Sequence, residues 1–343
     1  MNEAVVAMTL IWTFIFIYAI LGSIDFGTGF WVMLYERGKR SRAGELANRF
    51  LSPSWHITNV FLVLLVISVY SFFPSAAFTL GTVLLIPASL VLVFLALRSA
   101  FMVFSVTTRR YRNTLRYISG ISGIFVPALL VSVLPITAGG FIDVVNGEEQ
   151  LLLGKLFTSP TEYAYIAFGL SSQLFLSSLF LSDYARESAE EETYQIFRKK
   201  AIWFGPLTLI TAVLTIIFMA PEATWLKENI IAQRGWFSLS IIAFIIGYSA
   251  LWWKPKETQH TQGRPRIAVV SVVTQYAFAT IGYATSHWPY IVYPNVSIET
   301  SLTNLSMLRA LLISFTVGSL ILIPFFIYFW YLFMKDKEYL RQE

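Results

Sequence analysis

The chain has 343 residues, of which 56% are hydrophobic and only 13% are charged. Together with a mean hydropathy of +0.64, this composition excludes a soluble globular protein and predicts a polytopic membrane protein. The net charge of +5 does not indicate nucleic-acid binding, because the basic residues lie between apolar segments and not on one face. The absence of cysteine excludes disulfides, iron–sulfur clusters and thiolate metal ligands.

Apolar segments long enough to cross a bilayer, about 20 residues each, occur nine times in the sequence. The predicted fold is therefore all-α, with nine transmembrane helices. The chain opens with MNEAVVAM, which lacks the basic region and cleavage site of a signal peptide, so we expect the first segment to be retained. We place the segments at 4–35, 54–72, 75–106, 116–138, 161–183, 200–220, 236–253, 267–287 and 305–334.

The basic residues are unevenly distributed between the loops. Most lysines and arginines follow the first, third, fifth, seventh and ninth segments, whereas the opposite loops carry only Lys155, Lys227 and Arg234. The positive-inside rule then predicts an N-terminus outside and a C-terminus in the cytoplasm. An odd number of spans requires the same arrangement.

The connection at 139–160 is longer than the links within the two groups of segments that it joins. We therefore expect a first four-helix bundle at 1–140, an outer loop at 141–160 and a second four-helix bundle at 161–290. Residues 291–343 would supply a further outer loop, a peripheral ninth helix and a cytoplasmic tail. Four spans per group would give the two bundles the same orientation, as in parallel repeats.

The first segment contains a carboxylate, Asp25, in the run LGSIDFGTGFW. An acid at membrane depth is costly unless it faces protein or water, and it is by default a candidate functional residue. Gly22 and Gly29 share its helix face, where small residues would let a second helix approach and shield the acid from lipid. The alternative is a buried acid that only orients helices.

Arg98 interrupts the third segment. Counting ten residues back from the cytoplasmic ends near Tyr35 and Thr108 places Asp25 and Arg98 at the same depth, about 15 Å into the membrane. Equal depth predicts an ion pair, which would lessen the cost of both charges. The alternative is that Arg98 extends alone to the cytoplasmic surface.

The second segment begins LSPSWHITNV, in which Ser52 is a predicted N-cap and Pro53 the first helical residue. His56 would then lie in the first turn, at the cytoplasmic end, where the helix dipole disfavours an imidazolium. Asn59 follows one turn later. His56 is either a proton-entry group or an interfacial histidine without a further role.

The sequence offers little to hold a redox centre. There are three histidines in all, too few for the axial ligands of several haems. No phosphate-binding GxxxxGK[ST], HExxH pair or TVGYG filter occurs. Gln173 and Gln275 are expected to join helices by hydrogen bonds. We predict no catalytic group, metal site or bound cofactor in this chain, so that any redox centre belongs to another chain.

Three motifs resemble subunit II of the cytochrome bd quinol oxidases. They are IDFGTG in the first segment, Pro53-x-Trp55 followed by His56 and then Asn59-Val60, and LxxR at Arg98. The length, nine spans, outer N-terminus and scarcity of histidine are also similar to this family. Asp25 matches the acid of its first-helix motif, and His56 stands where many members carry an acid.

The resemblance implies a non-haem subunit of a prokaryotic cytoplasmic-membrane oxidase, which couples quinol oxidation to the reduction of O2 to water. Haem b and haem d would belong to a homologous subunit I. This chain would support that subunit and contribute to proton access from the cytoplasm through Asp25, His56 and Arg98. The resemblance also allows a contribution to O2 access. The resemblance also allows a structural quinone in this chain and small single-helix subunits in the complex.

Two other readings stay open from the residues. A secondary transporter of parallel repeats could use Asp25 to couple a proton to a solute, although the prolines inside the segments do not occupy corresponding positions in the two halves. A purely structural scaffold would need Asp25 for assembly but not for turnover.

Overall fold

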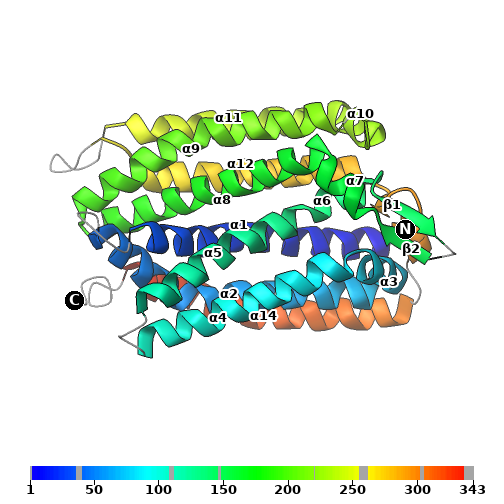
Figure 1. Ribbon diagram of the computed structural model, residues 1–343, viewed down its shortest axis with the longest axis horizontal. Coiled ribbons are helices and arrows are strands. Elements are labelled where there is room, and N and C mark those ends of the chain that lie inside the picture. The colour runs from blue at the N-terminus through cyan, green and yellow to red at the C-terminus, as the bar shows by residue number, and fades with distance from the viewer. Residues whose placement is uncertain are drawn as a thin grey trace.

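The computed structural model describes residues 2–35, 41–107, 112–145, 148–219, 221–254, 262–301 and 305–335. Figure 1 shows a bundle of long helices, with the short helices α3, α7 and α10 and the strands β1 and β2 at one end. The helices are α1 (Asn2–Leu34), α2 (Ser41–Phe72), α3 (Pro74–Val83), α4 (Leu85–Thr107), α5 (Arg112–Val131), α6 (Val133–Ala138), α7 (Leu153–Thr158), α8 (Pro160–Glu187), α9 (Glu191–Phe218), α10 (Thr224–Ala232), α11 (Arg234–Ser249), the 3-10 turn η2 (Ala250–Trp252), α12 (Pro265–His287), α13 (Ile298–Ser301) and α14 (Leu305–Lys335).

Helix α1 runs between the other long helices and contacts α2, α5, α8, α12 and α14. On one side, α4 packs on α5 beside it; on the other, α8 packs on α9 and α12 on α11. Helix α1 approaches α8 closely at Gly27, because this residue has no side chain. A Cβ there would lie only 2.8 Å from the backbone oxygen of Gln173. A small residue at such a crossing lets two backbones approach within the membrane.

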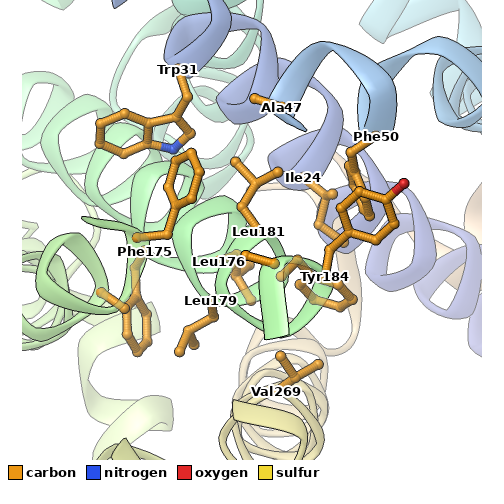
Figure 2. Close-up of a cluster of buried hydrophobic side chains, with 14 of the residues drawn as sticks. Ile24, Trp31, Ala47, Phe50, Phe175, Leu176, Leu179, Leu181, Tyr184 and Val269 are labelled. Carbon is orange, nitrogen blue, oxygen red and sulfur yellow. The ribbon is translucent and has the colours of Figure 1, made fainter. Parts of the chain in front are cut away.

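The largest buried cluster joins α1, α2 and α8 (Figure 2). Trp31 of α1 is almost fully buried and donates a hydrogen bond from Nε1 to Ser177 Oγ at 2.9 Å. Phe50 of α2 packs edge-on against Tyr184 of α8, with ring centroids 5.2 Å apart. The start of α2 is thereby part of the core.

Helix α2 begins at Ser41, so the prediction that Ser52 caps it and Pro53 is its first residue is wrong. The physical reason is an apolar face ahead of the proline, formed by Ala43, Leu46 and Phe50, all fully buried. Burial of this face stabilises the early turns and outweighs the backbone hydrogen bond that a proline removes.

This longer helix also changes the interpretation of His56. The residue lies well inside α2 and not in its first turn, so the argument from the helix dipole does not apply. The side chain of His56, like those of the other residues at 52–57, lies outside the described part of the chain.

Two predicted segments are each interrupted. Helices α3 and α4 fill the third segment and α5 and α6 the fourth, and α3 ends at Val83 and α5 at Val131. Each end lies four residues before a proline, Pro87 or Pro135. A proline lacks the N–H that would bond to that carbonyl oxygen and its ring clashes with it, which explains both breaks.

The connection expected as a loop at 141–160 contains an antiparallel hairpin, β1 (Ile142–Val145) and β2 (Glu148–Leu151), followed by α7. A second hairpin, β3 (Tyr290–Val292) and β4 (Val296–Ser297), precedes α13. Trp225 Nε1 donates to Ala138 O at 2.8 Å, and Tyr293 N donates to Thr137 O at 3.0 Å. These bonds tie the end of α6 to the second half of the chain.

Eight helices in the described residues are long and apolar enough to cross a membrane. The segment predicted at 54–72 corresponds to α2, whose described apolar part, Thr58–Phe72, is shorter. Large apolar side chains are exposed along α4, α9, α11 and α14, as expected for helices in contact with lipid or with another membrane subunit.

Candidate functional site

The predicted ion pair between Asp25 and Arg98 is confirmed. Arg98 Nη2 lies 3.1 Å from Asp25 Oδ2, and both side chains are buried, at 3% and 5% exposure. The same Nη2 donates to the backbone oxygen of Asp25 at 2.9 Å. Arg98 therefore turns inward to α1 and does not extend to the cytoplasmic surface.

The guanidinium of Arg98 also lies over the ring of Phe26, with Cζ 4.7 Å from the ring centroid. An aromatic face attracts a cation, most strongly where water is excluded. The positive charge is thus held by a carboxylate, a carbonyl oxygen and an aromatic ring of one stretch of α1.

Two glycines make the space for this guanidinium. A Cβ on Gly29 would lie 2.8 Å from Arg98 Nη1, and a Cβ on Gly123 of α5 would lie 2.6 Å from the same atom. The close contact predicted at Gly29 is therefore made by an arginine side chain of α4, while α5 closes the site at Gly123. Sequence reasoning missed Gly123, because nothing in the sequence shows that its helix faces Asp25.

Gly22 has a different environment from Gly29. The three atoms nearest to a Cβ on Gly22 belong to Phe26 and Tyr18 of the same helix, at 3.4 Å or more. The close approach of a second helix backbone is thus found at Gly27, while Gly29 makes room for the Arg98 side chain and Gly22 for neither.

Some buried polar atoms of this site have no hydrogen-bond partner among the described residues. They include Asp25 Oδ1, Arg98 Nη1 and Tyr18 Oη. Gln173 meets the expectation of a helix-joining residue, since its Nε2 donates to Gly123 O at 3.2 Å. The site therefore holds a carboxylate with Oδ2 paired to a cation and Oδ1 buried without a hydrogen-bond partner among the described residues.

The structure contains further buried charges that the sequence analysis did not select. Asp183 of α8 pairs with Arg266 of α12, with Oδ2 and Nε 2.6 Å apart. Glu162, in the first turn of α8, is buried and accepts a hydrogen bond from Ser132. Both acids lie near the ends of α8, where hydropathy does not separate buried carboxylates from exposed ones. The available signal for Asp183 was the apolar run that ends at Leu181, together with Tyr184 directly after it.

The described residues contain no group of three or more His, Asp or Glu side chains placed to hold a metal ion. Of the three histidines, His287 is the one whose side chain the structure describes. It packs between Trp225 and Tyr283, whose ring centroids lie 5.4 and 5.8 Å from its own. Its ring thus lies among the aromatic side chains at this end of the bundle.

An apolar groove lies between α1 and α12, with a volume of about 570 Å³. Trp12 and Phe16 line it from α1, and Ala277, Ile281 and Ala284 line it from α12. Such a lining suits a hydrocarbon chain and does not suit a polar solute.

A bundle of long apolar helices that buries the Asp25–Arg98 ion pair defines the class: an integral membrane protein. Comparisons with known proteins identify the family. The family model described as cytochrome bd terminal oxidase subunit II matches residues 3–333. The chain belongs to this family.

Individual relatives agree with the family model over the whole chain. A Bacillus subtilis (strain 168) protein named putative cytochrome bd menaquinol oxidase subunit II is 45% identical over 342 residues, covering 100% of this chain and 99% of that protein. A chain in the structure of bd oxidase from Geobacillus thermodenitrificans is 32% identical, with a TM-score of 0.83, covering 97% of this chain and 99% of that one.

Membership makes the chain a multi-pass cytoplasmic-membrane subunit of a quinol oxidase, an oxidoreductase complex. It also implies a subunit I as partner. The relatives give no support to a secondary transporter.

Proposed function

We propose that this chain is the nine-span subunit of a menaquinol-oxidising cytochrome bd complex, with its N-terminus outside and its C-terminus in the cytoplasm. Menaquinol is taken from the name of the Bacillus subtilis relative. The homologous subunit I would carry haem b and haem d, and this chain would support it as a pseudo-symmetric partner. Two four-helix bundles and a peripheral α14 fit the helix contacts.

Within this complex, Asp25 is the proton-conducting residue of the chain. The observation that carries this proposal is the unequal environment of its two oxygens: Oδ2 is paired with Arg98, while Oδ1 is buried without a partner among the described residues. Arg98 is the counter-charge that makes an ionised carboxylate tolerable at this depth. A carboxylate held in this way can gain and lose a proton without leaving a net buried negative charge.

His56 is the proposed relay between the cytoplasm and Asp25. It precedes Asn59 on α2, and α2 packs against α1. The structural quinone that the family allows would fit the apolar groove between α1 and α12, whose lining suits an isoprenoid chain. Small single-helix subunits would cover exposed apolar faces such as that of α14.

Co-purification tests the assembly. The chain, tagged and extracted in mild detergent, is expected to bring with it a haem protein with a d-type absorbance band. Isolation of a folded chain free of any haem protein would contradict the proposal.

Steady-state oxygen consumption tests the role of Asp25. Asp25→Asn should lower turnover per haem by at least about tenfold, since a positioned acid or base contributes about 10²-fold or more. Asp183→Asn is the matched control, because Asp183 is equally buried and also paired with an arginine. Equal turnover in Asp25→Asn and the unmodified complex would leave Asp25 a structural residue.

A further inference from the structure

Tyr18 lies on α1 two helical turns before Asp25, on the same face. Its side chain is buried, with 8% of the residue exposed. The carbon that bears its hydroxyl group lies 3.8 Å from the position of a Cβ on Gly22. Because Gly22 has no side chain, the phenol end lies along α1 over Gly22, one turn from Asp25.

The surroundings of this hydroxyl are otherwise apolar. Tyr18 belongs to a buried cluster with Phe26, Val91 and Val126. Its hydroxyl lies within electrostatic reach of both Asp25 and Arg98. A phenol hydroxyl placed in such a cluster is costly without a partner.

Three unpartnered polar atoms thus gather in one buried region: Tyr18 Oη, Asp25 Oδ1 and Arg98 Nη1. Each is a side chain at least nine-tenths buried. Buried polar groups in native proteins are satisfied by protein or by ordered water, and a buried water typically makes about three hydrogen bonds. These three atoms could supply the hydrogen bonds of one water molecule. Arg98 Nη1 would donate to it, Asp25 Oδ1 would accept from it, and the Tyr18 hydroxyl could donate or accept.

We propose that these three atoms form a site for a bound water molecule, and that Tyr18 positions this water for proton exchange with Asp25. The inference rests on the proposed role of Asp25 in proton conduction. Asp25, once protonated from the cytoplasmic side, gives the proton on Oδ1 to this water, and the water passes one of its own protons to the next water on its outer side. The water stays neutral, and the acid returns to a carboxylate paired with Arg98.

Tyr18→Phe tests this site, because it removes the hydroxyl and keeps the ring in the apolar cluster. Tyr276→Phe is the matched control: Tyr276, on α12, also has a buried hydroxyl, which lies beside Ser172 of α8. Infrared difference spectra of the assembled, haem-loaded complex would follow the carboxyl C=O band of Asp25, assigned by its loss in Asp25→Asn. Exchange into H₂¹⁸O would identify bands of bound water.

We expect Tyr18→Phe to shift the Asp25 carboxyl band, to abolish one water band and to lower turnover about three- to tenfold, the effect of one hydrogen bond. Tyr276→Phe should change none of these. An unshifted carboxyl band with the water band retained, the absence of any Asp25 carboxyl band, or loss of haem from Tyr18→Phe would overturn the inference.

The turnover of Asp25→Asn separates the two proposals. If Asp25→Asn is slow and Tyr18→Phe is normal in turnover and spectra, only the water site fails. If Asp25→Asn turns over normally, the proton role of Asp25 itself fails.

Discussion

At the scale of single residues, Gly29 and Gly123 decide where the guanidinium of Arg98 lies. A Cβ at either position would lie within 3.0 Å of Nη1, so the guanidinium would have to shift from its present place. The pairing of Asp25 with Arg98 was predictable, because helical rise converts sequence position into depth. The contribution of Gly123 and of Tyr18 was not, since depth says nothing about which helix faces Asp25.

The first prediction concerns the energetic coupling of Asp25 and Arg98. Arg98→Leu should destabilise the complex by about 3–5 kcal/mol, because it leaves a buried carboxylate without its cation. Asp25→Asn combined with Arg98→Leu should cost less than the sum of the single changes, by about 0.5–3 kcal/mol. Denaturant unfolding in detergent measures all three variants, and additive losses would refute the coupling.

A second prediction concerns the glycines of α1. Gly27→Ala should destabilise by about 1–3 kcal/mol, because the added methyl group meets the backbone of α8 at Gln173, which cannot rotate away. Gly22→Ala is the control and should leave stability nearly unchanged, since its methyl group would make ordinary contacts at 3.4 Å or more. Thermal unfolding of the two variants compares them; equal melting temperatures would contradict the close α1–α8 contact.

At the scale of elements, hydropathy predicts where the apolar helices lie but not where they begin or break. Serine followed by proline at 52–53 is a good helix start in isolation, yet α2 continues through it. The reason is tertiary: Phe50 packs on Tyr184, from a segment far away in the sequence. The breaks before Pro87 and Pro135 follow from local chemistry and could have been predicted from the sequence. The role of Gln173 in joining two helices was predicted from the sequence.

The third prediction tests the core role of the start of α2. Phe50→Ala should destabilise by about 3–5 kcal/mol, the usual cost of a phenyl-sized cavity in a core. Phe78→Ala removes the same group from a side chain that is 76% exposed in α3, and should have a much smaller effect on unfolding. Similar losses for the two variants would mean that the early turns of α2 contribute little.

At the scale of the whole molecule, charge distribution and structure bear on the orientation in the membrane. The N-terminal ends of α1 and α14 lie at one end of the bundle, because Arg309 Nη2 and Glu3 Oε1 are 2.7 Å apart. The hairpin β1–β2 and α10 lie at that end as well (Figure 1). In the proposed orientation, which follows from the positive-inside rule, this end faces the outside.

Cysteine labelling tests this orientation, since the native chain has no cysteine. Glu228→Cys, exposed on α10, should react with a membrane-impermeant maleimide on intact cells. Glu192→Cys, exposed at the start of α9, should react only after permeabilisation. The reverse pattern would place the N-terminus in the cytoplasm.

The central claim is that Asp25 takes up protons for a reaction whose metal centres lie in another chain. Its most direct test is proton uptake by the haem-loaded Asp25→Asn complex in liposomes, followed with a pH-sensitive dye on the side of the cytoplasmic loops during O2 reduction. The account predicts that uptake slows by at least about tenfold while the haem content and the helix assembly are unchanged. Proton uptake and oxygen consumption at the rates of the unmodified complex would contradict it.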